Sequence, residues 1–407
     1  MSEGSGFSWS TAGQLVLSAA GVFLLSTISL GGTLFLVLNR VFGDPASPAG
    51  QIDPTLIFLA GIGFSGVLLV PSALAAAGNL YGFKAAGLSS WRGASWLILL
   101  VPPLLLAGYA VTQNYSRGRV LLPLIHVLVN GSFVFWLIFQ IRKGLDKGSD
   151  QRFWGVFGSG LVLSPLLALI VEVFLLLAIG FFWSGYLMSD AVLAEEYFSV
   201  VEQLKTSSFD PQLLENLAAE YLLKPGMIIT LFLYIAVMIP LVEEVIKTIG
   251  VWLLWKRELR PEEGFTLGAL SGAGYALFEN LTMAVVNEAW VGVVVSRLGT
   301  TAVHMITGGI MGWGLVSGWQ EKRLGRMVSA YGAAVLIHGA WNGINIGIAL
   351  AAVPQFEQVF APYLVRLAEY APAGLIILAL GALGGLAGAN SWTKRAIMTR
   401  ANSTKGN

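Results

Sequence analysis

The chain has 407 residues, of which 56% are hydrophobic and only 12% charged, and it contains 49 glycines. This composition indicates a polytopic membrane protein rather than a water-soluble one. The formal net charge of +1 offers no bulk basicity for nucleic acid, and the lack of cysteine excludes disulfides, thiolate metal sites and a cysteine nucleophile.

Ten stretches are apolar over about the 20 residues that one helix needs to cross a bilayer. They are residues 15–38, 56–77, 94–111, 121–141, 156–187, 227–255, 266–286, 291–319, 328–350 and 373–387. We therefore predict an all-α fold, a polytopic transmembrane helix bundle of about ten spans with a short helical loop on the outer face.

Lysine and arginine mark the cytosolic side of membrane proteins. Three clusters follow the sixth, eighth and tenth predicted spans: Lys256, Arg257 and Arg260; Lys322, Arg323 and Arg326; Lys394, Arg395 and Arg400. Arg117 and Arg119, after the third span, do not fit this pattern. The remaining clusters predict that both termini are cytosolic.

The connection 188–224 is acidic and lies on the outer face in this topology. Its apolar residues recur at helical spacing in two stretches, which predicts two short amphipathic helices serving as a lid on the membrane surface or as a substrate-docking element. We divide the chain into N-terminal transmembrane helices of unknown role (1–187), the acidic extracytosolic loop (188–224), a catalytic four-helix transmembrane core (225–350), and the last span with a cytosolic tail (351–407).

Glu243, Glu244 and Lys247 interrupt the sixth apolar stretch. Ionisable residues inside a membrane span are costly and point to a functional site. Lys247 follows Glu244 by three residues and Glu243 by four, so its side chain can reach either carboxylate. The two carboxylates point about 100° apart on the helix. Two carboxylates and one ammonium leave one negative charge, which favours a shared proton and a general base.

The next three spans contribute Glu279, His304, and His338 with Asn342. At about 1.5 Å per helical residue, Glu243, Glu279, His304 and His338 all lie roughly 15 to 22 Å from the cytosolic helix ends. This common depth predicts one site. His338 and Asn342 share one helix face, where both can donate hydrogen bonds to a developing oxyanion.

These motifs carry a family resemblance. Glu-Glu-x-x-Lys at 243–247, the glycine-rich run that ends in Phe278-Glu279-Asn280, the central His304 and His338-x-x-x-Asn342 resemble the PrsW family of intramembrane proteases, which is similar in turn to the CAAX-processing and bacteriocin-processing membrane peptidases. The resemblance covers residues 227–350. Met283 stands where the family often has tyrosine, and Asn342 where it often has aspartate.

The resemblance implies an intramembrane peptidase of a bacterial cytoplasmic membrane. Its substrate would be a membrane protein or a membrane-associated peptide, met in the lipid bilayer, and nucleic acid would play no part. One of two glutamates would activate water, with histidine and asparagine stabilising the oxyanion. The implied catalytic residues are Glu243, Glu244, Lys247, Glu279, His304, His338 and Asn342.

Two alternatives stay open at this point. We expect no cofactor, but carboxylates and imidazoles can also hold zinc, in which case the ligands would come from Glu243, Glu244, His304 and His338. An ion- or proton-coupled transporter, or a catalytically inactive membrane scaffold, would also place charged residues at mid-membrane.

Overall fold

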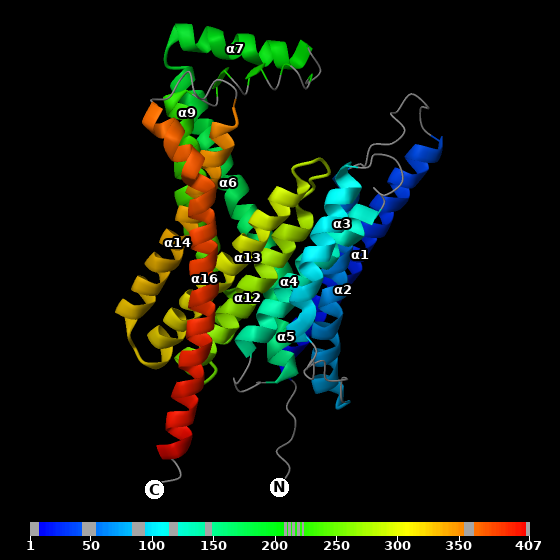
Figure 1. Cartoon of the computed structure of the whole chain (residues 1–407), viewed down its shortest axis with the longest axis vertical. Helices are drawn as coiled ribbons and strands as arrows, with labels where there is room; N and C mark the ends of the chain where they lie inside the picture. Colours follow the sequence, from blue (N-terminus) through cyan, green and yellow to red (C-terminus); the bar gives the residue numbers. More distant parts are fainter. Residues whose placement is uncertain are drawn as a thin grey trace. The chain divides into compact units, whose positions relative to one another are not determined.

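The computed structural model describes residues 8–42, 54–83, 94–113, 121–142, 149–206, 224–353 and 362–403, with isolated positions at 210, 213, 216, 217, 220 and 221 (Figure 1). Every regular element in these residues is a helix. The chain forms two compact units, one of Met1–Pro165, Glu244–Ala334 and Ala379–Asn407, the other of Leu166–Glu243 and Val335–Leu378. Arg117 and Arg119 lie outside the described residues.

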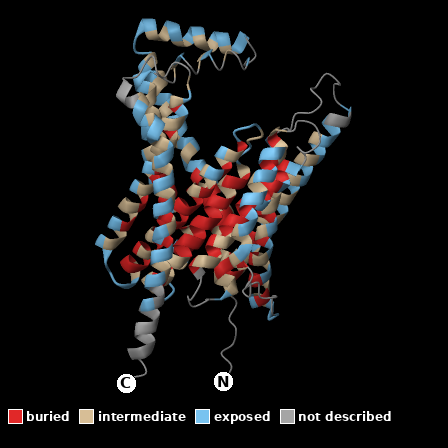
Figure 2. Cartoon of the chain, in the orientation of Figure 1, coloured by how far each residue is buried: buried red, intermediate tan, exposed pale blue. Residues whose placement is uncertain are grey.

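The first unit is built around two central helices. Its elements are α1 (Trp9–Phe42), α2 (Pro54–Tyr81), η2 (Ala94–Leu100), α3 (Val101–Gln113), α4 (Leu122–Arg142), α5 (Asp150–Gly158), the π-helical η4 (Ser159–Leu163), α11 (Ile249–Trp252), α12 (Pro261–Thr282) and α13 (Trp290–Gln320), together with the end of α10 (Ile239–Ile246), the start of α14 (Leu324–Ala351) and the end of α16 (Pro362–Ser403). Helices α12 and α13 pack along each other, and α2, α4, α5 and η4 pack on α12. Buried residues are therefore concentrated on α12, α13 and α4 (Figure 2).

Glycines set the close approach of α12 and α13. An added Cβ would lie 2.5 Å from the Gly312 carbonyl oxygen at Gly264, 2.1 Å from the Gly308 oxygen at Gly268, and 2.2 Å from the His304 oxygen at Gly272. Small residues four apart on one helix thus face backbone of the antiparallel neighbour, a common way for membrane helices to pack. This register fixes the position of His304 against α12.

We expect Gly268→Ala to lower the stability of the fold, because its Cβ meets the Gly308 backbone, which has no flexible side chain to move aside. Overpacking of this kind costs about 1–3 kcal/mol. Thermal unfolding in detergent measures the effect. The matched control is Gly292→Ala in the same helix pair, because an added Cβ at Gly292 meets nothing within 4 Å; equal melting temperatures for the two variants would refute the packing account.

The second unit holds the remaining helices. They are α6 (Ser164–Leu187), α7 (Ala191–Thr206), α9 (Pro225–Phe232), the π-helical η5 (Leu233–Met238), the start of α10 (Ile239–Ile246), the second part of α14 (Leu324–Ala351) and the first part of α16 (Pro362–Ser403). Ile346 and Leu350 of α14 form its hydrophobic core with Ile228, Leu231 and Ile235. The core therefore holds α14 against α9 and η5.

Helix α7 is attached to the start of α9 by a polar cluster within the second unit. The Tyr221 hydroxyl donates to Glu196 Oε1 at 2.8 Å, and Lys224 Nζ lies 3.0 Å from the same oxygen. The Tyr221 hydrogen bond and the Lys224 ammonium lower the pKa of Glu196, and the bond to Glu196 raises the pKa of Tyr221 to about 12. The cluster is thus built for an ionised Glu196.

This attachment predicts a pH dependence. A lowered folded-state pKa means that the stabilisation is complete above the ordinary Glu pKa of about 4.3 and is lost as the pH falls through the lower folded value. Hydrogen exchange of α7, corrected for intrinsic rates, should therefore become faster as the pH is lowered from 6 to 3, two values that bracket the ordinary Glu pKa of about 4.3. Glu196→Gln should show the faster exchange already at neutral pH, whereas the exposed Glu202→Gln should match the parent.

The predicted all-α membrane bundle is confirmed. Each of the ten predicted stretches is helical over most of its length, although the sixth is interrupted at Lys247 and the seventh leaves the helix after Thr282. Eight helices in the described part of the chain are long and apolar enough to cross a membrane. Helices α12 and α13 are not among the eight, because their glycine, serine, threonine and charged residues lower the hydropathy of helices that are buried in the first unit. The first of the two predicted loop helices is α7; the second falls mostly outside the described residues.

Candidate active site

The helix that carries the two glutamates is broken at Lys247. Helix α10 ends at Ile246 and α11 begins at Ile249. In a membrane, a backbone carbonyl freed by such a break must find a donor within the protein. The Lys247 carbonyl oxygen accepts hydrogen bonds from Ser271 Oγ at 2.5 Å and Ser164 Oγ at 3.5 Å. Hydroxyls of neighbouring helices therefore support the break.

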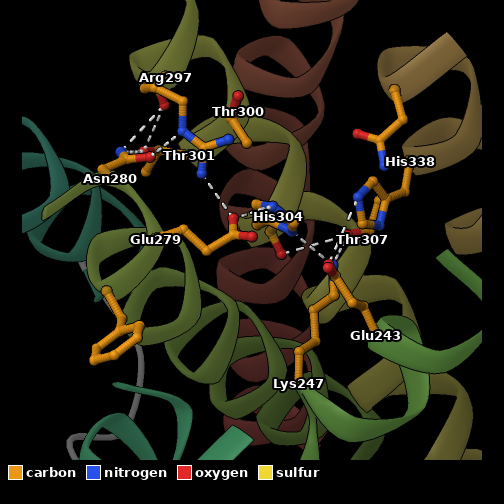
Figure 3. A network of polar contacts seen from close by, with 12 residues as sticks. Glu243, Lys247, Glu279, Asn280, Arg297, Thr300, Thr301, His304, Thr307 and His338 are labelled. Carbon is orange, nitrogen blue, oxygen red and sulfur yellow. Dashed lines mark hydrogen bonds and ion pairs between the residues drawn. The ribbon is translucent and has the colours of Figure 1, made fainter. Parts of the chain in front are cut away.

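The Lys247 side chain is bound on all sides. Its ammonium donates to Glu244 Oε1 at 2.5 Å and to Thr307 Oγ1 at 3.0 Å, and lies 2.9 Å from His304 Nδ1 (Figure 3). Lys247 and Glu244 are fully buried. These three contacts use the three ammonium protons. Of the two carboxylates that Lys247 was expected to reach, it binds Glu244.

His304 lies between a cation and an anion. Its Nδ1 faces Lys247, and its Nε2 lies 3.0 Å from Glu279 Oε2. A neutral imidazole with the proton on Nε2 satisfies both contacts, because Nδ1 then accepts from the ammonium and Nε2 donates to the carboxylate. The Tyr275 ring packs against the imidazole, with ring centroids 5.3 Å apart. The first unit thus brings Glu244, Lys247, His304 and Glu279 into one hydrogen-bonded chain.

Two further residues of this hydrogen-bonded network were not predicted from the sequence. Arg297 Nη2 donates to Glu279 Oε2 at 2.8 Å, and Thr307 accepts from Lys247 (Figure 3). Arg297 stands in a predicted membrane span seven residues before His304. A charged residue inside a membrane span requires a partner, so the sequence alone could have identified Arg297 as a candidate site residue. Thr307 carries no such signal in the sequence.

Glu243 and His338 form the corresponding pair in the second unit. Glu243 Oε2 lies 3.7 Å from His338 Nε2, and both side chains are nearly buried (Figure 3). This distance is too long for a direct hydrogen bond between the two side chains. Glu243 and Glu244 are consecutive, so the helix presents its two carboxylates to different partners.

Close helix packing places His338 beside Glu243. A Cβ added at Gly339 would lie 2.4 Å from the Ala236 carbonyl oxygen, so only glycine lets α14 approach η5 this closely. The neighbouring Gly343 faces the Ala236 side chain. Gly339 and Gly343 therefore determine how near the His338 ring comes to the end of η5 and the start of α10.

Asn342 supplies a hydrogen bond that Pro240 cannot make. In the π-helical η5, the Ile239 amide donates to the Tyr234 oxygen, five residues back. The same pattern would pair the Ile235 oxygen with residue 240, which is a proline and has no N–H. Asn342 Nδ2 donates to the Ile235 oxygen at 3.0 Å instead. One of the two Asn342 amide hydrogens is therefore committed to holding α14 against η5.

The donor chemistry for a metal is present in three buried residues. Glu243, His304 and His338 each offer one ligand atom of the kind that zinc binds. However, Lys247 lies at His304 Nδ1 and Glu279 at His304 Nε2. An ion at His304 would have to displace one of these partners. The observed contacts therefore fit a neutral imidazole between an ammonium and a carboxylate, with both His304 nitrogens already engaged, and they do not fit His304 as a metal ligand.

Comparison with known proteins gives one family match. Residues 172–367 match the family described as PrsW family intramembrane metalloprotease. No curated protein and no solved structure matches the chain. The matched region contains all seven predicted site residues, and it confirms the resemblance predicted from the four motifs.

Proposed function

We propose that this chain, whose residues 172–367 match the family described as PrsW family intramembrane metalloprotease, hydrolyses a peptide bond in or beside the membrane, with Glu243 as the base that activates water. The family assignment implies a membrane substrate and a lipid environment. The observation that carries the choice of base is that Lys247 binds Glu244. Glu243 lies beside His338 in the second unit, with 3.7 Å between Glu243 Oε2 and His338 Nε2.

The proposed reaction starts with a water molecule between Glu243 and His338. Glu243 takes a proton from this water as its oxygen attacks the scissile carbonyl carbon, and the carbonyl oxygen becomes an oxyanion. His338 stabilises the oxyanion by donating a hydrogen bond. Glu243 then returns the proton to the amide nitrogen as the C–N bond breaks, so that a new carboxyl end and a new amine end form.

Asn342 has a double role in this proposal. One amide hydrogen holds α14 to the Ile235 carbonyl, which keeps His338 in place. The second amide hydrogen is the one that we assign to the oxyanion, because His338 and Asn342 lie on the same face of α14. Replacing Asn342 would then reduce catalysis both through lost stabilisation and through a displaced histidine.

The hydrogen-bonded chain of the first unit anchors the helix that carries the base. Glu244 follows Glu243 directly, and its carboxylate is fixed by Lys247, which is fixed in turn by His304 and Thr307. We assign Glu244, Lys247, His304 and Glu279 to positioning. Preorganised side chains of this kind contribute to rate by holding the base within a few tenths of an ångström of its productive place.

A chelation experiment tests the metal-free mechanism. The purified protein, in liposomes with membrane proteins from cells that lack it, should generate new peptide ends detectable by mass spectrometry. We expect o-phenanthroline and EDTA to leave this cleavage unchanged and the protein to contain no stoichiometric zinc. His338→Gln serves as the inactive control. Loss of cleavage on chelation, restored by added zinc, would replace the glutamate mechanism by a metal-dependent one.

A further inference from the structure

Arg297 makes a two-point contact with the end of α12. Its Nη2 donates to Glu279 Oε2 at 2.8 Å, and its Nε donates to Asn280 Oδ1 at 2.8 Å. Adjacent residues of one helix thus receive two separate donors of one guanidinium, a geometry that the planar fork of arginine permits and a lysine ammonium cannot reproduce. The Arg297 side chain is largely buried, with 18% of its surface exposed.

Asn280 is itself fixed from several sides. Its Nδ2 donates to the Arg297 carbonyl oxygen at 3.2 Å and to Thr301 Oγ1 at 2.9 Å. Its own carbonyl oxygen lies 2.8 Å from His126 Nε2, and Trp290 Nε1 donates to the other nitrogen of His126 at 3.3 Å. Asn280, Thr301 and Trp290 are completely buried. This polar cluster therefore holds Arg297 at a fixed place on the α12 and α13 pair.

Arg297 affects His304 because both side chains contact the same carboxylate oxygen of Glu279. Glu279 Oε2 is contacted by both Arg297 Nη2 and His304 Nε2. While the carboxylate is held there, the imidazole proton is favoured on Nε2, and Nδ1 stays open to accept from Lys247. A proton on Nδ1 would set two donors against each other, His304 and the Lys247 ammonium, and would weaken the contact between them.

We propose that Arg297, held by Asn280, is a positioning residue of the protease: it fixes Glu279, and through Glu279 the tautomer in which His304 accepts from Lys247. The inference rests on the proposed function for its effect on cleavage, but its structural step can be measured without a substrate. Substituting a residue that orients a metal-bound histidine through its second nitrogen typically costs about 10- to 100-fold in metal affinity or activity, and we take the same scale for the orientation of His304.

The test uses histidine labelled with ¹⁵N, because the chain has only three histidines. Solid-state NMR of the protein in liposomes distinguishes Nδ1 from Nε2 and protonated from unprotonated nitrogen, and His126→Gln and His338→Gln assign the signals. We expect parent His304 to carry its proton on Nε2. In Arg297→Gln the His304 signals should show exchange between tautomers, and cleavage should fall about 10- to 100-fold.

The matched control is Arg326→Gln, which breaks the exposed 2.8 Å contact between Arg326, near the start of α14, and Glu321, just after α13. Its His304 signals and cleavage should equal those of the parent. An unchanged His304 spectrum in Arg297→Gln would overturn the proposal. If that variant fails to fold, Arg297→Lys decides, because it keeps the charge: reduced cleavage at an unchanged melting temperature supports the proposal, and parental cleavage contradicts it.

The two proposals fail in different ways. Cleavage that persists in Glu243→Gln would refute the assigned base and leave the His304 result standing. A His304 spectrum that does not respond to Arg297→Gln would refute the positioning role and leave the base untouched.

Discussion

Glu243→Gln should abolish proteolysis while leaving the protein folded. The amide has almost the shape of the carboxylate but cannot accept a proton from water, and loss of a general base lowers rates by about 10²- to 10⁴-fold. Because Lys247 is bound to Glu244, the Glu243 substitution leaves the buried ion pair intact. Cleavage of reconstituted membrane proteins and thermal unfolding, measured on the same preparation, check both halves of this expectation.

Glu244→Gln provides the comparison one residue along the chain. It removes the counter-ion of the buried Lys247, so we expect a lower melting temperature as well as reduced cleavage. The exposed Glu202→Gln controls for loss of an acidic side chain elsewhere. If Glu243→Gln lost stability and Glu244→Gln lost only cleavage, the assigned roles of the two glutamates would have to be exchanged.

Lys247→Met should cause the largest loss of stability of any substitution considered. Methionine fills a similar volume but leaves the fully buried Glu244 carboxylate without its ammonium, together with His304 Nδ1 and Thr307 Oγ1. Removing one partner of a buried ion pair typically costs about 3–5 kcal/mol. Unfolding by an increasing fraction of a denaturing detergent, followed by circular dichroism, measures this loss of stability.

A double substitution separates the ion pair from general packing. Glu244→Gln combined with Lys247→Met removes both charges, and we expect it to be more stable than Lys247→Met alone, because no unpaired carboxylate remains. Lys256→Met, at an exposed position beyond α11, should unfold like the parent. A double variant that is as unstable as the single one would show that packing, and not the buried charge, sets the cost.

The helical architecture was predictable because a membrane span can be recognised by the length of its apolar run. Apolar runs of about 20 residues identify helices whatever their neighbours are, and Pro54, Pro225 and Pro261 stand at the first positions of three of them. The interruptions were not predictable. The break at Lys247 depends on hydroxyls of Ser164 and Ser271, which are distant in the sequence.

The candidate site was predictable in its residues but not in its pairings. Charged residues in spans are rare enough to be noticed individually, which identified Glu243, Glu244, Lys247 and Glu279. Glu243 and Glu244 both lie within reach of Lys247, and the spacing alone cannot choose between them. The choice is made by His304 and Thr307, on another helix, which draw the ammonium toward Glu244.

The role of Asn342 shows a second limit. From the sequence, an amide four residues after a histidine is an oxyanion donor on the same helix face. In the structure it first replaces the hydrogen bond that Pro240 lacks, a relation that becomes visible only once η5 is known to be π-helical. In an ordinary α-helix, the Ile235 carbonyl would pair with Ile239 and would not need Asn342.

The most direct measurement compares membrane proteins in cells that carry the parent chain with those in cells that carry Glu243→Gln, by mass spectrometry of protein ends. The proposed function predicts that at least one membrane protein accumulates at full length in the variant and that its shortened forms, with ends inside or beside a membrane span, disappear. The same set of full-length and shortened membrane proteins in both strains would contradict it.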